Sequence, residues 1–397
     1  MHIPDGMLDA KTFTTLWAGG AGGIGYASWW IRKNLDASKV VLMAVLAALI
    51  FGLQMLNFPI AAGTSGHFAG GALAGILLGA WPASIVMSAV LLVQALFFGD
   101  GGITTLGANI VNMGIIAPFT GVLIYRLFQR LKSNYASKII GAFTGAFLAV
   151  VASSVLVALE LWISNRAQFF AALSAMVFWH ALIGIAEAFV TAGIIAYIAK
   201  VRPQLLDSEP SQGRTSLKSV SVVLGVVALA ATGLSFLAVT YPDGLEFVYF
   251  DSGIGEQFEG SAYVSMAPLS DYLLPGVGND VLATIGAGII GVVLSGAVIF
   301  AVATLLSRRS SQRPQTSFAQ EPHTSFAQEP QTSFAQEPQT SSAQRLQASS
   351  AQEPKTFSAQ KPQTFSAPSH SSEPPDSAEP IPYIEPPSSQ DPHTTDD

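Results

Sequence analysis

Long apolar runs dominate the first three quarters of the chain and restrict what it can fold into. A helix needs about 20 apolar residues to cross a bilayer core of about 30 Å. The run Val40–Ile50 shows no alternation of apolar and polar residues, which a transmembrane β-strand requires. We therefore predict an all-α polytopic membrane protein. The expected spans lie near residues 12–31, 40–57, 82–99, 104–128, 138–163, 170–199, 219–240 and 280–306.

The number of spans depends on a shorter segment, Phe68–Ala80, which is rich in Gly and Ala. If it crosses, the chain has nine transmembrane helices, seven and then two, with the N-terminus outside and the C-terminus in the cytoplasm. In that topology 14 Lys and Arg residues lie inside, and only Lys11 and Arg166 lie outside. If it does not cross, every later loop changes sides and the bias disappears. The positive-inside rule therefore favours nine spans.

The charge of the chain separates into two unlike parts. Residues 1–313 hold 16 basic and 15 acidic residues, whereas residues 314–397 hold 3 basic and 11 acidic ones, so the net charge of −7 comes from the tail. A body with about one charge per ten residues is unlike a soluble enzyme or a nucleic-acid-binding protein. The chain has no cysteine, which excludes disulfides, thiolate zinc sites and iron–sulfur clusters.

Composition also divides the chain into segments. The loop 241–280, expected outside between the last two spans, contains seven acidic residues and no basic one. It either attracts divalent cations or is simply solvated. The Pro-, Ser- and Gln-rich repeats near the C-terminus bury too little apolar surface to fold, so we expect disorder there. The predicted segments are a transmembrane module over 1–200, a cytoplasmic linker over 201–218, a two-span module over 219–306 and a repetitive cytoplasmic tail over 307–397.

The N-terminus carries the first candidate for chemistry. Met1–Ala10 lacks the basic region of a signal peptide, so we expect Met1 to remain as the first residue, on the outer side. A free amine followed by His2 offers three nitrogens in sequence: the amine, the His2 amide and the His2 imidazole. Planar nitrogen donors suit Ni(II), Cu(II) or Co(II). His67, in Gly63-Thr-Ser-Gly-His67, could supply a fourth nitrogen, although the Met-His pair alone is weak evidence for metal capture.

Among the ionisable residues of the predicted spans, we consider three in particular: Glu160, His180 and Glu187. Such groups are candidates for function because insertion is costly. The structural alternatives are a hydrogen bond across a helix interface for His180, an interface role for Glu187, and contact with the outer headgroups for Glu160.

Several motifs resemble the substrate-capture subunits of energy-coupling-factor importers for cobalt and nickel, the CbiM/NikM family. The resemblance begins with Met1-His-Ile-Pro-Asp-Gly6 and continues through Gly63–His67, Gly101–Asn109 and Asn112-Met-Gly114, over roughly residues 1–200. The second module resembles the companion subunit of nickel systems, through the motif Pro242-Asp-Gly-Leu-Glu246 that names the PDGLE domain.

The resemblance implies a metal site formed by the Met1 amine, the His2 amide nitrogen, the His2 imidazole and the His67 imidazole. Hydrogen bonding around these ligands would fall to Thr104, Thr105 and Asn109, with Ser65 as a further candidate. For the stretch 101–109, helix packing is the equally weighted alternative. Ser65 stands where some cobalt-type relatives have Cys, which slightly favours nickel without deciding between Ni²⁺ and Co²⁺.

The resemblance also implies partners: a transmembrane coupling subunit and two ATPase subunits, in a bacterial plasma membrane. The chain contains no P-loop motif, so ATP hydrolysis is expected on separate chains, with no enzyme activity, no catalytic cofactor and no nucleic acid here. Two alternatives remain open. A stand-alone secondary transporter would use Glu160, His180 and Glu187 as a proton path, and a non-transporting membrane scaffold would bind no metal.

Overall fold

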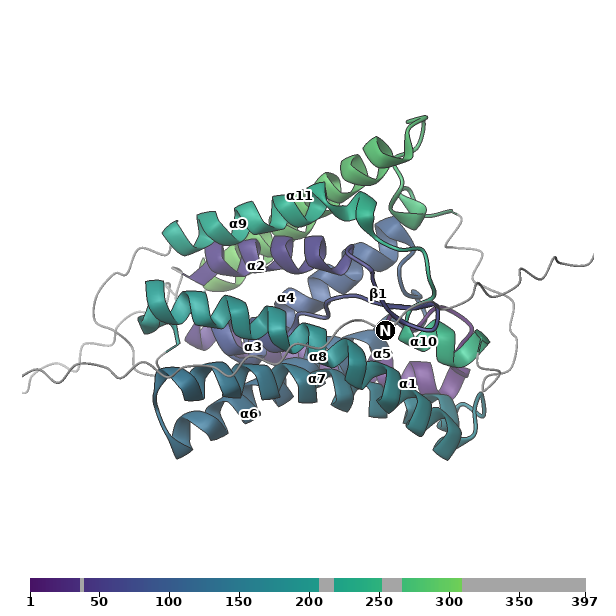
Figure 1. Ribbon diagram of the computed structural model, residues 1–397, viewed down its shortest axis with the longest axis horizontal. Coiled ribbons are helices and arrows are strands. Elements are labelled where there is room, and N and C mark those ends of the chain that lie inside the picture. Colours follow the sequence, from purple (N-terminus) through teal and green to yellow (C-terminus); the bar gives the residue numbers. More distant parts are fainter. Residues whose placement is uncertain (36–38, 207–217, 252–265, 309–397) are drawn as a thin grey trace, which may run out of the picture. The chain divides into compact units, whose positions relative to one another are not determined.

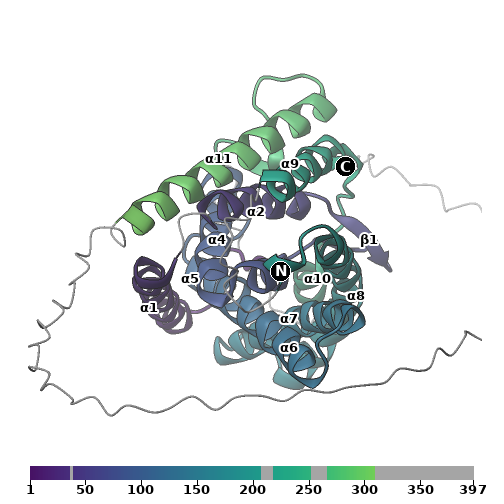
Figure 2. The same ribbon diagram turned by 90° about the vertical axis from the view of Figure 1, so that its left-hand side faces the viewer.

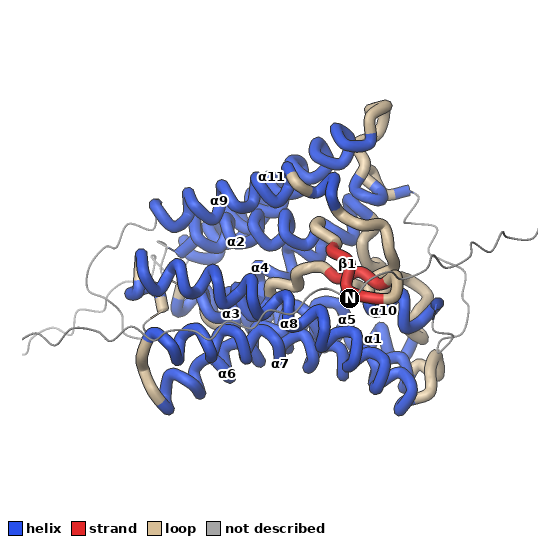
Figure 3. Tube along the Cα trace, viewed as in Figure 1, coloured by secondary structure: helices blue, strands red, loops and turns tan. Residues whose placement is uncertain are grey.

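Helices form most of the regular structure in the computed structural model, which describes residues 1–35, 39–206, 218–251 and 266–308 (Figure 3). All of them belong to one unit, Met1–Ala319. The longer helices are α1 (Ala10–Asn34), α2 (Lys39–Gln54), α4 (Ala80–Val93), α6 (Ala117–Leu131), α7 (Tyr135–Ile163), α8 (Phe169–Val201), α9 (Lys218–Gly233) and α11 (Asp280–Arg308). The short ones are α3 (Gly71–Leu78), α5 (Leu106–Asn109) and α10 (Gly244–Glu246).

Five helical stretches in the described part of the chain are long and apolar enough to cross a membrane. They are Ala80–Phe98, Leu106–Leu131, Tyr135–Ile163, Phe169–Val201 and Asp280–Ser307. The chain is therefore a multi-pass membrane protein. The count of nine spans and the orientation stay predictions, and the predicted disordered tail lies outside the described residues from 309 onward.

The structure differs from the all-α expectation by one small hairpin. Strand β1 (Phe58–Ala61) pairs antiparallel with β2 (Thr64–Gly66). Gly63, with φ +79°, turns the chain between the strands, a conformation that glycine adopts without steric cost. The hairpin carries the chain from the end of α2 directly to His67.

The segment Phe68–Ala80 contains only the eight-residue helix α3, which spans about 12 Å at 1.5 Å per residue. Gly70 precedes α3 at φ +81°, and Gly79 separates α3 from α4 at φ +88°. A helix of this length cannot cross a bilayer core of about 30 Å on its own. Any crossing here must therefore use the non-helical residues before α3 as well.

Two π-helical stretches adjoin the loop between α4 and α5. Gln94–Phe98 extends α4, and Ile110–Ile116 joins α5 to α6. Single π-helical turns within α-helices often occur at functional sites. The loop between them, residues 99–105, reaches the N-terminal segment.

The two helices of the second module, α9 and α11, pack against α2 (Figures 1 and 2). Gly291 of α11 is placed against the Phe51 ring, where a Cβ would lie 2.0 Å from the ring carbons. Between α9 and α11, helix α10 contacts α8 and β2. The second module therefore touches the first in several places, which include α2, α4 and the region beside the hairpin.

Candidate metal centre

The first three residues lie buried at the centre of the site. Met1, His2 and Ile3 are 6%, 7% and 0% exposed. The Asn109 side chain pairs with the Ile3 backbone, because Oδ1 accepts the Ile3 N–H at 2.8 Å and Nδ2 donates to the Ile3 carbonyl at 3.1 Å. The Gly102 N–H donates to the same carbonyl at 2.9 Å. These bonds fix the backbone just after the two residues that are expected to bind metal.

The loop before α5, residues 99–105, also holds the N-terminal segment at Asp5. Asp5 Oδ1 accepts from the Thr104 N–H at 2.7 Å and from its hydroxyl at 2.5 Å, and the Thr105 hydroxyl donates to the Ile3 carbonyl. Gly102 needs to be glycine, since a Cβ would lie 2.3 Å from the Asp5 nitrogen. The structure thus places both threonines on the N-terminal backbone and Asp5, and not on an imidazole nitrogen.

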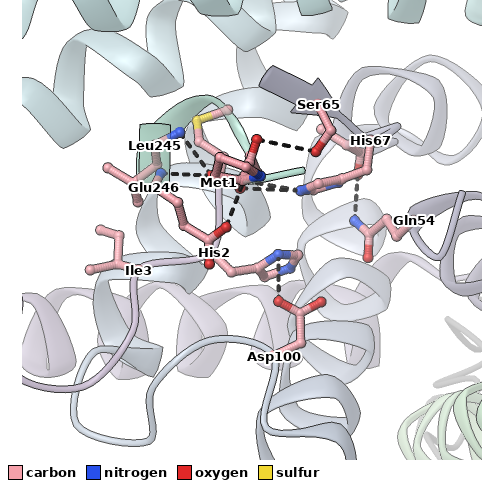
Figure 4. Close-up of polar contacts among 12 residues, drawn as sticks. Met1, His2, Ile3, Gln54, Ser65, His67, Asp100, Leu245 and Glu246 are labelled. Carbon is pink, nitrogen blue, oxygen red and sulfur yellow. Dashed lines mark hydrogen bonds and ion pairs between the residues drawn. The ribbon is translucent and has the colours of Figure 1, made fainter. Parts of the chain in front are cut away.

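His67 faces the N-terminal amine. Its Nε2 lies 3.0 Å from the Met1 nitrogen, and its Nδ1 lies 3.3 Å from the Phe68 carbonyl (Figure 4). A carbonyl only accepts hydrogen bonds, so Nδ1 carries the proton and Nε2 keeps its lone pair. His67 therefore offers a metal-ligating nitrogen to the position occupied by the amine.

The His2 ring stacks on the His67 ring, with centroids 5.1 Å apart and planes at 19°. The His2 Nδ1, which could close a chelate ring with the His2 amide, contacts Asp100 Oδ1 at 3.1 Å instead. Burial lowers the pKa of His2 to about 4, and the negative charge of Asp100 offsets only part of this effect. The ring is therefore neutral near pH 7, and a metal must take Nδ1 from Asp100.

The structure adds Asp243 to the site, which we did not predict from the sequence. Its Oδ2 forms an ion pair with the Met1 amine and lies 3.8 Å from His67 Nε2. Burial alone would raise the pKa of Asp243, but the adjacent Met1 ammonium holds it well below the usual range. Its Oδ1 accepts from the Leu245 and Glu246 N–H groups, which begin α10.

The Asp243 position could have been anticipated in part. Asp at an N-cap followed three residues later by Glu forms a capping box, and here the Glu246 carboxylate accepts the Asp243 N–H at 3.0 Å. The capping box predicts a helix start at Asp243. The capping box does not predict what Oδ2 of Asp243 contacts, because that depends on long-range packing.

Ser65 attaches the second module beside His67. Its N–H donates to the Pro242 carbonyl at 2.8 Å, and its hydroxyl donates to the Tyr241 carbonyl at 2.7 Å. The structure therefore places Ser65 on the backbone of the motif that carries Asp243. Among the described residues, the Ser65 hydroxyl has no hydrogen bond to a candidate metal ligand.

A small cavity adjoins the amine. His180 is 1% exposed, and its Nδ1 donates to the Met176 carbonyl of the same helix at 2.8 Å. This bond lies within α8, so the expected hydrogen bond across a helix interface is not the one that His180 makes. Its Nε2 has no hydrogen-bond partner in the described part of the chain. The cavity is lined by Met1, Gly66, His67, Ala69, Val150, His180, Ile183 and Asp243.

The two buried glutamates serve different contacts. Glu187 accepts from the Ala69 N–H at 2.7 Å and from the Gly70 N–H at 3.1 Å, just before α3. This fits the interface role that was the structural alternative for Glu187. Glu160 is 5% exposed and accepts from Asn112 at 2.9 Å, so the expected contact with outer headgroups is wrong. Within the described ranges, neither carboxylate forms a hydrogen bond with His180.

Of the four nitrogen ligands expected from the sequence, only two belong to side chains, those of His2 and His67. In the described ranges, no group of three or more His, Cys, Asp or Glu side chains is arranged to hold a metal ion. A metal site here would therefore need backbone nitrogens at the N-terminus, in addition to the two imidazoles. The chemistry of planar nitrogen donors suits nickel or cobalt more than zinc.

Residues 2–205, just over half of the chain, match the family model described as the cobalt uptake substrate-specific transmembrane region, CbiM. The chain belongs to the CbiM family. Residues 217–308 match the PDGLE domain, so a CbiM region and a PDGLE domain are fused in this protein.

Relatives of this CbiM-family chain are named for nickel or cobalt transport. A protein of Archaeoglobus fulgidus, provisionally named the fused nickel transport protein NikMN, is 36% identical over 76% of this chain and 98% of its own length. The fused nickel transport protein NikMN of Rhodobacter capsulatus is 30% identical over 78% of this chain and all of its own length. A solved structure described as a truncated transition metal transporter is 36% identical, covers 50% of this chain and 99% of that one, and has a TM-score of 0.47.

Proposed function

We propose that this chain is the substrate-binding membrane subunit of an energy-coupling-factor importer for Ni²⁺ or Co²⁺. The cation would be held by the Met1 amine, the His2 amide nitrogen, the His2 imidazole and the His67 imidazole. The observation that carries the proposal is the buried Met1 amine, 3.0 Å from His67 Nε2, whose lone pair points at it. The names of relatives favour nickel and cobalt as cargo, and do not choose between them.

The contacts of the site suggest how it receives a cation. The Met1 ammonium, paired with Asp243, occupies the position beside His67. An incoming dication must displace a proton from the amine before it can bind there, so metal binding and proton release are coupled. The Asp243 carboxylate then stays as the negative charge that faces the cation. Among the described residues of the acidic loop, Asp243 is the carboxylate that would face the cation.

Partners and location complete the proposal. A transmembrane coupling subunit and two ATPase subunits on separate chains would drive release of the cation into the cytoplasm. The chain would lie in a bacterial plasma membrane, with Met1 outside. The contacts made by Glu160 and Glu187 weigh against the proton-path alternative, because each carboxylate is engaged by N–H donors elsewhere.

An N-terminal extension tests the chelate directly. Two glycines added before Met1 convert the amine into an amide, which should weaken nickel binding by more than about 100-fold, since even outer partners of a metal site contribute about 10–100-fold. Isothermal titration calorimetry and nickel content per purified chain measure the effect. Two glycines added at the C-terminus provide the matched control. Equal affinity in both variants would disprove the chelate.

A further inference from the structure

The cavity beside the Met1 amine contains a nitrogen donor that the proposed chelate does not use. His180 Nε2 is buried and has no hydrogen-bond partner among the described residues. A buried polar atom without a partner costs free energy, and this one faces a cavity shared with Met1, His67 and Asp243. It therefore calls for an explanation beyond helix packing.

The tautomer of His180 makes Nε2 available as a ligand. Its Nδ1 contacts the Met176 carbonyl at 2.8 Å, and because a carbonyl cannot donate, Nδ1 must carry the proton of the neutral ring. The lone pair is then on Nε2. The bond to Met176 also fixes the orientation of the ring, as the outer partners of metal-binding histidines commonly do.

Helix α10 lies directly against this ring. A Cβ on Gly244 would lie 3.0 Å from His180 Cε1 and 3.3 Å from Nε2, so only glycine allows this approach without displacement. Asp243, the preceding residue, brings its carboxylate to the same cavity. The apolar residues Ile183 and Ala69 also line the cavity.

We propose that His180 Nε2 binds the incoming cation transiently, before the cation reaches the four nitrogens of the N-terminal chelate. This inference rests on the proposed function. His180, Asp243, Met1 and His67 line one cavity, and Asp243 is the member that comes from the acidic loop. A neutral imidazole can replace one water ligand of a dication without releasing a proton. The Met1 amine is paired with Asp243 and the His2 Nδ1 with Asp100, so these ligands must first leave a partner and therefore follow later.

The test measures how fast full-length protein in detergent takes up nickel. NiCl₂ is mixed rapidly with metal-free protein, and the absorption of planar Ni–N coordination is followed. We expect His180→Gln to slow loading by about 10- to 100-fold, with the same final spectrum and one nickel per chain. Thr191→Val is the control, since Thr191 is a buried residue of α8 that does not line the cavity. Loading of His180→Gln at the wild-type rate would overturn the proposal.

Chemical rescue separates a nitrogen donor from a space-filling ring. In His180→Ala, added imidazole should restore the loading rate, whereas pyrrole, which has the same shape but no available lone pair, should not. Restoration by both molecules would mean that the ring only fills space, and the proposal would be wrong. A changed final spectrum in His180→Gln would place His180 in the resting ligand set and would also overturn transient binding. If wild-type protein never develops the planar spectrum, the chelate itself fails, which is a distinguishable result.

Discussion

At the scale of single residues, metal binding at the proposed site requires the Met1 amine to exchange its present partner, Asp243, for the cation. Met1 is held by Asp243 on one side and His67 on the other, and the rings of His2 and His67 stack. His2 is in turn held by Asp100. A cation that binds all four proposed nitrogens must replace the contact to Asp243 and the contact to Asp100. Two carboxylates are therefore left beside it as counter-charges.

Replacing Asp243 with Asn tests the role of the second module in metal binding. The variant removes the charge that faces the cation and the ion pair that holds the amine, so nickel affinity should fall by about 10- to 100-fold in titration calorimetry. Asp271→Asn is the control, because it removes one charge from the same loop at an exposed position. Similar losses in both variants would indicate general attraction by the loop instead.

The pKa of His2 predicts that acid releases the N-terminal segment of the metal-free protein. Its pKa is about 4 when buried and 6.5 in the unfolded chain, so the docked segment is fully stable above pH 6.5 and loses stability as the pH falls toward 4. The loss at pH 4 should be on the order of 100-fold in the docking equilibrium.

Hydrogen exchange at the Ile3 amide measures this docking, since the amide is bonded to Asn109. His2→Gln, compared with wild type at each pH, removes the titrating group and corrects for the pH dependence of exchange itself. Equal protection of the two proteins at pH 4 would show that His2 does not control docking.

At the scale of elements, the short helix α3 depends on a carboxylate from another helix. Glu187 of α8 accepts the N–H groups of Ala69 and Gly70, which have no partner within α3. Because His67 lies two residues before Ala69, this contact also fixes the chain next to the metal site. α8 thus supports the site twice, through His180 and through Glu187.

Replacing Glu187 with Gln should destabilise the protein and leave nickel affinity nearly unchanged. Gln offers one oxygen acceptor where Glu offers two, so one buried N–H loses its partner, at a cost of about 1–3 kcal/mol. Thermal unfolding in detergent measures the change. Glu160→Gln keeps an acceptor for Asn112 and should have a smaller effect. A complete loss of uptake in Glu187→Gln at wild-type stability would instead favour the proton path.

Apolar length predicted the long helices to within a few residues, as in α7 and α8, because a membrane span depends mostly on local composition. Length could not predict α3, which is shortened by Gly70 and Gly79 and completed by Glu187. The sequence predicts Met1, His2 and His67 as ligands of one site. In the structure the Met1 amine and the two imidazole rings lie close together. Asp243 was not predicted, because its position depends on packing between segments more than 170 residues apart.

At the scale of the whole molecule, the fusion of two domains brings residues of both to one site. The PDGLE domain packs its helices on α2 and delivers Asp243 and Gly244 to a site formed by the CbiM region. Neither region contains all the charges of the site. A single chain keeps the two parts at a fixed ratio and a high effective concentration.

The tail after Arg313 should be dispensable for transport. Deletion of residues 314–397 removes none of the described contacts of the site, so nickel uptake by cells that carry the coupling and ATPase partners should be unchanged. Uptake of radioactive nickel, divided by the amount of protein in the membrane fraction, is the measurement. Reduced uptake at normal membrane levels would assign the tail a function.

The hydrogen bonds between Asn109 and the Ile3 backbone fix the position of residue 3, and with it how far the Met1 amine can reach. Asn109 holds the backbone at residue 3, so only Met1 and His2 extend from this point toward His67. One inserted residue would move the amine by up to about 3.5 Å, whereas metal–nitrogen bonds tolerate only about 0.2 Å. The proposed chelate therefore requires a fixed number of residues before the contact with Asn109, in addition to the right ligand atoms.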